Sequence, residues 1–261
     1  MISPANPPPK RAILLFTHSP TTEAQTKPIA GFSMAERVTL YEELISHTLA
    51  TAGATPYPAL VATTHASYAL QCPQIAHTFA QRGRNFSERL TAALIDAFEL
   101  GYEEVVAIGN DCVDLSAADL EAAFGLLQRY DIALGSAADG GVYLIAARRG
   151  TLPKLETAFA QCRWQTGHVQ GDLLLEAACL GVRTALLGTR SDLDTIEDLM
   201  RTAHVHRELR ALCRLAQKLF SAITPQVLLR NIAFPLSRHL IRQYSQRPPP
   251  DSWFHSILPC V

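Results

Sequence analysis

Carboxylate side chains follow three apolar stretches that are typical of buried strands. These acids are Asp111 and Asp114 after residues 105–108, Asp139 after residues 132–138, and Asp192 with Asp194 after residues 184–188. If strands and helices alternate along the chain, loops that follow strands meet at one edge of a largely parallel sheet, where ligands bind. Carboxylates at that edge can hold Mg²⁺ or Mn²⁺, which bind one or two of them together with a substrate's phosphates.

Each acid also has an ordinary structural explanation. Asp and Asn are favoured in turns, and Asp114 can help to start the helix predicted after it. The sequence Asp139-Gly140-Gly141 between two apolar runs is a strong hairpin signal. These glycines permit either a tight turn or the close approach of a ligand to the backbone, and residue type does not separate the two. Taken singly, each acid fits a structural role better than a catalytic one.

The elements that would position these acids alternate along the chain. Short apolar runs predict strands over residues 12–16, 58–63, 104–109 and 183–188, with two more inside residues 131–149 on either side of Asp139. Apolar residues at helical spacing predict helices over residues 33–53, 86–101, 116–130, 172–181 and most of 194–220. Residues 17–31 are expected to form a polar loop, and the stretch around Ile75 and Phe79 is ambiguous. This order predicts an α/β fold on a largely parallel sheet.

The composition is that of a globular chain with an uneven distribution of charge. It has 261 residues, of which 48% are hydrophobic, enough for one large or two small domains. Residues 201–261 hold nine Lys/Arg and two Asp/Glu, against fourteen and twenty-two in the rest. The six cysteines are widely spaced and form no C-x-x-C pair, which favours reduced thiols and a cytoplasmic location. We expect no nucleic-acid partner and, because no run approaches 20 apolar residues, no transmembrane segment.

The two ends of the chain differ from the middle. Residues 1–10 include three consecutive prolines and are predicted to be a disordered leader. Residues 201–261 are predicted to be a basic helical extension of a single α/β domain over residues 11–200. The arginines of this extension alternate with Leu, Ile and Phe, so it could lie on an anionic membrane surface as a peripheral contact. We favour the alternative, in which its apolar side packs on the parent domain or on a second subunit of a homodimer.

Several common catalytic motifs are absent from the sequence. It contains no G-x-x-x-x-G-K-[ST] phosphate loop, no G-x-G-x-x-G after the first predicted strand, no G-x-S-x-G and no H-E-x-x-H. These absences exclude the usual P-loop, dinucleotide-binding, serine-hydrolase and zinc-protease classes.

Six blocks of the sequence together carry a resemblance to a known family. In order they are LLFTHSP, GRNFSERL, IGNDCVDLSAADLEAA, GSAADGGVYLIAARR, WQTGHVQGDLLLEAACLGV and SDLDTIEDL. Over roughly residues 10–200 they resemble a bacterial family of uncharacterised proteins described as glycosyltransferase-like, of the type linked to arsenosugar biosynthesis. The resemblance implies one Rossmann-like domain of the nucleotide-diphospho-sugar transferase superfamily, GT-A-like, with a mixed, largely parallel sheet flanked by helices. It also implies a nucleotide or nucleotide-sugar ligand and an unidentified acceptor.

The resemblance assigns expected roles to individual residues. Asp111 and Asp114 would bind Mg²⁺ or Mn²⁺, and Asp139 would orient the donor sugar or act as a base toward the acceptor. The expected donor-binding residues are His18, Lys27, Arg89, Asn110, Gly140, Gly141, Trp164, Thr166, Asp192 and Asp194. Residues 164–166 read Trp-Gln-Thr where the family has Trp-Ser-Thr.

The first loop departs from the family pattern. Family members typically have a basic loop there that ends in Lys-Thr-Arg, whereas this chain has THSPTTEAQTKPIAG, in which His18 replaces a basic residue and Lys27 remains. Because a diphosphate needs cationic or N–H partners when it leaves water, this loop predicts weakened, altered or lost nucleotide binding. Three functions follow: metal-dependent glycosyl transfer from a nucleotide-diphospho-sugar, nucleotidyl transfer from a nucleoside triphosphate, or a non-catalytic binding module that keeps the fold.

Overall fold

The computed structural model describes residues 10–27, 29, 31–65, 75–193 and 195–232, with the backbone alone for residues 222–232. Its contacts divide the chain into two compact units. The first is Met1–Glu23 with Leu44–Asp192, and the second is Ala24–Glu43 with Leu193–Val261. The predicted division at residues 10 and 200 stays a prediction. The expected disordered leader and most of the proposed membrane-contacting tail lie outside the described residues.

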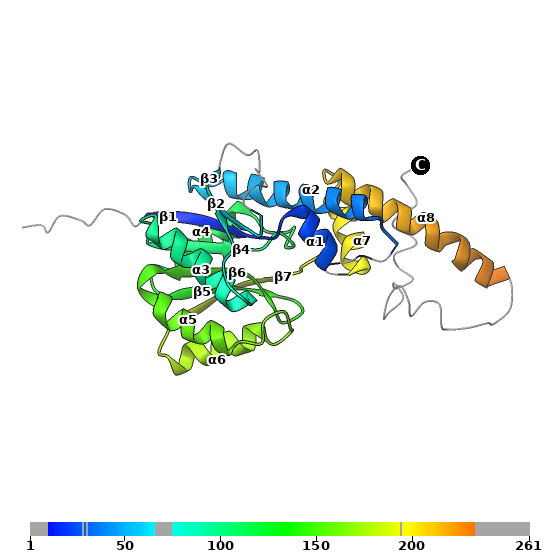
Figure 1. Cartoon of the computed structure of the whole chain (residues 1–261). Helices are drawn as coiled ribbons and strands as arrows, with labels where there is room; N and C mark the ends of the chain where they lie inside the picture. The colour runs from blue at the N-terminus through cyan, green and yellow to red at the C-terminus, as the bar shows by residue number, and fades with distance from the viewer. Residues whose placement is uncertain (1–9, 28, 30, 66–74, 194, 233–261) are drawn as a thin grey trace, which may run out of the picture. The chain divides into compact units, whose positions relative to one another are not determined.

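A mixed sheet forms the centre of the first unit (Figure 1). Its strands are β1 (Arg11–Phe16), β2 (Ala59–Thr63), β3 (Ile75–Ala80), β4 (Glu104–Ile108), β5 (Ile132–Ala137), β6 (Val142–Arg148) and β7 (Thr184–Arg190). They lie in the order β3-β2-β1-β4-β6-β5-β7. All paired neighbours are parallel except those of β6, which runs antiparallel to β4 and β5. The fold class predicted from the sequence is therefore confirmed.

Helices cover both faces of this sheet (Figure 1). The helices among the described residues are α1 (Pro20–Thr26), α2 (Met34–Gly53), α3 (Phe86–Glu99), α4 (Ala117–Leu126), the short 3₁₀ helix η1 (Arg149–Thr151), α5 (Leu152–Gln161), α6 (Val169–Cys179), α7 (Ile196–Val205) and α8 (Arg210–Ile232). The buried apolar side chains form two core clusters, one on each face of the sheet. In one cluster α3, α5 and α6 pack on the sheet, and in the other α4 and the later part of α2 pack on the opposite face.

Side-chain alternation along the strands supplies both core clusters. In β1, Ala12 and Leu14 belong to the cluster under α3, whereas Ile13 and Leu15 belong to the cluster under α4. All four are at most 1% exposed. Strands buried on both faces read as continuous apolar runs, and for this reason the sequence pattern located β1, β2 and β4 correctly.

Some predicted elements were wrong or incomplete. The expected polar loop over residues 17–31 contains α1, and the ambiguous stretch at Ile75 forms β3. The stretch expected to be mostly helix over residues 194–220 forms α7 and most of α8, with a break between them where His206 leaves the helical region with φ −99° and ψ 69°. Helix α5, with a proline in its first turn, was not predicted.

The second unit is helical in its described part. Helix α7 begins with a capping box in which Thr195 and Asp198 bind each other's backbone N–H groups. The Glu43 carboxylate accepts the N–H groups of Ala211 and Leu212, both at 3.0 Å, at the start of α8. No helix in the described part of the chain is long and apolar enough to cross a membrane.

Candidate functional site

The candidate site lies at the edge of the sheet where the parallel strands end. Strands β1, β2, β4, β5 and β7 all finish at this edge, and β6 begins there. The loops after β4, β5 and β7 carry, respectively, Asp111 with Asp114, Asp139, and Asp192. The structure therefore brings the predicted acidic loops to one edge of one unit. Asp194 lies outside the described residues.

The negative charges of three of these carboxylates affect the same buried thiol. Cys112 is 3% exposed, and its pKa is raised by burial and then by the negative charges of Asp192, Asp111 and Asp114. A charge can act on the thiol in this way only from nearby. Acids from two loops, one after β4 and one after β7, therefore lie within electrostatic range of the same thiol.

Asn110, at the start of the same loop, is almost fully buried. It is 4% exposed, and its Nδ2 atom has no hydrogen-bond partner among the described residues. A buried amide donor without a partner is costly and points to a water or ligand as its acceptor. Asn110 is thus compatible with its predicted donor-binding role, which stays a prediction.

The turn at Asp139 has the structure of a hairpin turn. Its Oδ1 atom accepts the Gly141 N–H at 2.8 Å, while the Gly140 N–H donates to the Ala137 carbonyl at 3.1 Å. Gly140 has φ +92°, which favours glycine. The turn connects the antiparallel strands β5 and β6, so the hairpin interpretation of the Asp-Gly-Gly sequence is confirmed. A catalytic role for Asp139 stays a prediction.

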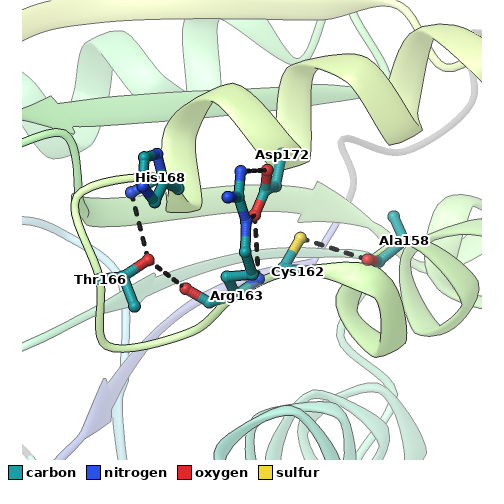
Figure 2. Close-up of polar contacts among 6 residues, drawn as sticks. All are labelled: Ala158, Cys162, Arg163, Thr166, His168 and Asp172. Carbon is teal, nitrogen blue, oxygen red and sulfur yellow. Dashed lines mark hydrogen bonds and ion pairs between the residues drawn. The ribbon is translucent and has the colours of Figure 1, made fainter.

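A short loop before α6 packs against this turn. Figure 2 shows the polar contacts within this loop and at the start of α6. The Thr166 hydroxyl donates to the Arg163 carbonyl at 2.6 Å and accepts the His168 N–H at 3.2 Å. The Gln170 N–H donates to the Gly140 carbonyl at 3.0 Å. Hydrogen bonds from the Arg163 side chain and then its backbone N–H lower the pKa of Asp172 to about 2. The loop is therefore held by its own side chains.

Trp164 also has structural partners. Its indole N–H donates to the Phe159 carbonyl at 2.7 Å, and its ring lies 4.7 Å from the Phe86 ring and 5.3 Å from the Phe159 ring, measured between centroids. These contacts give Trp164 and Thr166 structural roles, while their predicted donor contacts stay predictions.

Arg89 lies in the first turn of α3 and is half-buried. In the described chain its guanidinium has no acidic partner, and its Nε atom has no hydrogen-bond acceptor. By contrast, Arg82 pairs with Asp96 and Arg84 with Glu88. The same helical turn packs on the end of β1 through Phe86 and Phe16, whose ring centroids lie 5.4 Å apart. An unpaired guanidinium therefore lies beside the strand ends, where it can bind an anion.

The first loop contains an acid that the sequence analysis did not single out. Glu23 is 4% exposed, and its Oε1 atom accepts the His18 N–H at 3.3 Å. Lys27, the remaining basic residue of that stretch, belongs to the second unit, where its carbonyl accepts the Tyr41 hydroxyl at 3.2 Å. The predicted donor-binding roles of His18 and Lys27 stay predictions.

A second group missed by the sequence analysis connects β7 to α4. Arg190 donates to both carboxylate oxygens of Asp119, at 2.8 and 2.9 Å. Beside them, the Tyr143 hydroxyl donates to the Gly188 carbonyl at 2.9 Å. Burial and then the charge of Asp119 raise the pKa of Tyr143 to about 12. Asp119 lies in the helix predicted over residues 116–130, and no sequence signal connected it with Arg190, 71 residues away.

No group of three or more His, Cys, Asp or Glu side chains within the described ranges is arranged to hold a metal ion. The carboxylates are nevertheless hard oxygen donors, which suit Mg²⁺ or Mn²⁺. These ions commonly take one or two protein carboxylates and complete their coordination with water and substrate phosphates. The acids present therefore fit an ion that arrives with its substrate better than a resident one.

Residues 43–166 match the model of a family described as an uncharacterized protein conserved in bacteria (DUF2064). This match confirms, for that part of the chain, the predicted resemblance to an uncharacterised bacterial family. No curated protein matches the sequence.

The fold is similar to those of solved nucleotide-related enzymes. One structure, from Desulfovibrio desulfuricans G20, is described as a "putative nucleotide-diphospho-sugar transferase"; it is 24% identical, with a TM-score of 0.69 over 81% of this chain and 97% of that one. Another, 4-diphosphocytidyl-2C-methyl-D-erythritol synthase from Anaerococcus prevotii DSM 20548, is 8% identical, with a TM-score of 0.50 over 76% of this chain and 96% of that one. These likenesses show the fold alone, and it agrees with the fold class predicted from the sequence.

Proposed function

We propose that this chain is a metal-dependent glycosyltransferase that uses a nucleotide-diphospho-sugar donor. The observation that carries the proposal is the topology of the sheet, which brings the loops that contain Asp111, Asp114, Asp139 and Asp192 to the edge where β4, β5 and β7 end. In open α/β sheets this edge is where ligands bind. The likeness to a structure described as a nucleotide-diphospho-sugar transferase supports the same class of donor.

Asp111 and Asp114 are the residues that would hold Mg²⁺ or Mn²⁺. Such an ion would neutralise the charge that develops on a departing nucleoside diphosphate. Arg89, with no acidic partner in the described structure, would add a second positive charge toward the diphosphate. Asn110 would donate its buried Nδ2 hydrogens to the same ligand.

Asp139 would face the sugar or the acceptor. One of its oxygens accepts the Gly141 N–H, which fixes the carboxylate on the turn, and the residue is exposed. A carboxylate fixed in this way can orient a sugar hydroxyl or accept a proton from an acceptor hydroxyl. The rigid turn and the loop of residues 163–168 would keep it in position.

Isothermal titration calorimetry with a panel of nucleotide-diphospho-sugars in the presence of Mn²⁺ tests this function. We expect the wild-type chain to bind at least one donor, and Asp111→Asn to weaken that binding at least tenfold because it removes a charged ligand of the ion. Asp131→Asn is the matched control. Asp131 lies just before β5, at the opposite edge of the sheet, where it pairs with Arg183.

Two results would contradict the proposal. The first is a wild-type chain that binds no nucleotide sugar, which would favour a non-catalytic module. The second is an Asp111→Asn variant that binds as tightly as the Asp131→Asn control. Release of pyrophosphate from nucleoside triphosphates, measured in the same samples, would instead indicate nucleotidyl transfer.

A further inference from the structure

Strand β7 (Thr184–Arg190) forms one edge of the sheet, and among the described strands it pairs with β5 alone. The Ile132 N–H of β5 donates to the Arg183 carbonyl at 3.3 Å, and Ile132 lies opposite Thr184. Because alternate residues of a strand direct their N–H and C=O groups to opposite sides, Thr184 and Leu186 direct theirs away from β5. The outer side of β7 therefore presents backbone groups that another strand can bind.

The side chains of β7 do not protect this edge. Native edge strands are commonly protected by charged side chains, proline or a bulge. Residues 184–189 contain neither a charge nor a proline, and the register shift against β5 comes only after Leu187. Ala185 is buried under α4, so Leu186 points to the opposite face, where its side chain is 50% exposed. An uncharged, apolar edge of this kind favours the addition of a further strand.

A second copy of this chain fits the edge because the strand can match itself. Residues directly opposite each other in an antiparallel pair point to the same face of the sheet, which restricts the registers in which two copies of β7 can pair. A register centred on Leu186 meets this condition and places the exposed Leu186 side chains of the two copies side by side. On the other face, it places Ala185 of each copy opposite Leu187 of the other, so that a small and a large side chain meet.

The charges at the two ends of β7 are compatible with this register. It places Arg183 opposite Thr189 and Arg190 opposite Val182, so no charged side chain faces one of like sign. Both arginines already pair with acids of their own copy. Pairing of the two strands therefore introduces no repulsion and leaves no new charge without a partner.

We propose that β7 is a self-association edge, at which two copies of this chain pair antiparallel, with Leu186 opposite Leu186, to form one continuous sheet. The interface is isologous, as in most twofold dimers. Because one pair of strands buries less surface than a standard interface, we expect a reversible dimer with a dissociation constant of roughly 10–100 µM. This inference does not rest on the proposed function, since it involves no ligand.

Analytical ultracentrifugation of the full chain under reducing conditions, from about 5 to about 500 µM, tests the association. We expect the wild type to change from monomer to dimer over this range. Leu186→Lys and Leu186→Glu should each weaken the association at least tenfold, because each places two like charges opposite each other. An equimolar mixture of the two variants should restore it, because a lysine then faces a glutamate. Charged residues are common on native edge strands, so both variants should fold.

Leu175→Lys is the matched control. Leu175 is 62% exposed and lies two residues from the buried Leu173 and Ala177, so it points outward from α6. The substitution adds the same charge at an exposed leucine away from the outer side of β7, and it should leave the association unchanged.

Cysteine substitutions provide a second measurement. The Cα atoms of a hydrogen-bonded antiparallel pair lie about 5.5 Å apart, within the range that a disulfide spans. With oxidised glutathione as the oxidant, Leu186→Cys should form a disulfide-linked dimer on a non-reducing gel. Leu175→Cys should form no more linked dimer than the wild type, which sets the level due to the native cysteines.

Three results would overturn the inference. A wild type that stays monomeric over the whole range would show that this edge does not bind a second copy, and would leave it to another partner such as an extended peptide. A dimer that Leu186→Lys weakens no more than Leu175→Lys does would place the interface elsewhere on the chain. A mixture of the lysine and glutamate variants that stays monomeric would contradict the register centred on Leu186.

Discussion

Position 140 requires glycine for two separate reasons. Its φ of +92° is unfavourable for residues with a Cβ atom, and a Cβ there would overlap the Gly167 carbonyl. We expect Gly140→Ala to lower the free energy of unfolding by roughly 2–3 kcal/mol. Urea unfolding monitored by circular dichroism measures this.

The matched control for this substitution is Gly125→Ala. Gly125 lies within α4, and a Cβ there would have no atom within 4 Å outside the helix's own neighbouring backbone. Alanine is favoured over glycine inside a helix by about 0.5–1 kcal/mol, so this variant should be slightly more stable than the wild type. An unchanged stability of Gly140→Ala would show that the turn at Asp139 adapts, and it would weaken the case for a fixed carboxylate.

The ion pair between Arg163 and Asp172 should make the free energy of unfolding depend on pH in the acid range. The pKa of Asp172 is lowered to about 2. The ionised carboxylate therefore contributes fully to the free energy of unfolding above the ordinary carboxyl pKa near 4, and this contribution is lost as the pH falls through 2. The stability difference between wild type and Asp172→Asn should therefore be constant from pH 7 to 4 and shrink below pH 4. Urea midpoints at several pH values measure it; a difference that does not change with pH would contradict the ion pair.

Individual residues differ in how far the sequence predicts their contacts. The Asp139 turn was predictable because its hydrogen bonds connect residues within four positions of each other. The hydrogen bond from the His18 N–H to Glu23 is similarly local, but an isolated Glu in a polar stretch gives no signal that it is buried. The contact between Arg190 and Asp119 joins residues 71 positions apart. A single sequence, taken alone, carries no information on which distant residues are in contact.

At the scale of elements, Asp119 joins the start of α4 to the end of β7. It completes a capping box with Ser116 and also binds Arg190. We expect Ser116→Ala to cost about 1 kcal/mol of unfolding free energy, as is usual for loss of an N-cap. Asp119→Ala should cost about 2–3 kcal/mol, because it also leaves a partly buried guanidinium without its acid.

A double-mutant cycle with Arg190→Met separates the two contributions of Asp119. If the ion pair contributes, the cycle should give a coupling of about 1 kcal/mol between Asp119 and Arg190 and almost none between Ser116 and Arg190. Additive effects of Asp119→Ala and Arg190→Met would contradict a connection between α4 and β7 through this pair.

Elements with local signals were predicted, and elements without them were not. The helices predicted to start at residues 33 and 116 correspond to α2 and α4, which begin at a Ser33–Glu36 capping box and at the Ser116 cap, both of which can be recognised from residue type and spacing. Strand β3 has mostly exposed side chains, so it lacks the apolar run that marks a buried strand. The break between α7 and α8 contains neither glycine nor proline, and the sequence therefore gave no reason to end the helix there.

At the scale of the whole molecule, alternation of strands and helices predicts the class of fold but not the order of strands. The position of β6 between β4 and β5 depends on pairings between distant segments. This position matters for the site, because it places the Asp139 turn next to the end of β4 and its acids. The resemblance of motif order predicted a mixed sheet, and the structure confirms it.

The central claim is that acids from separate loops bind a divalent ion together with a nucleotide-diphospho-sugar. The most direct measurement is an anomalous difference map from a crystal of the chain grown with Mn²⁺ and the best-binding nucleotide sugar. The account predicts a manganese peak within about 2.3 Å of a carboxylate oxygen of Asp111 or Asp114, with the donor's phosphate oxygens as further ligands. A bound nucleotide with no ion at these acids, or an ion elsewhere on the chain, would contradict it.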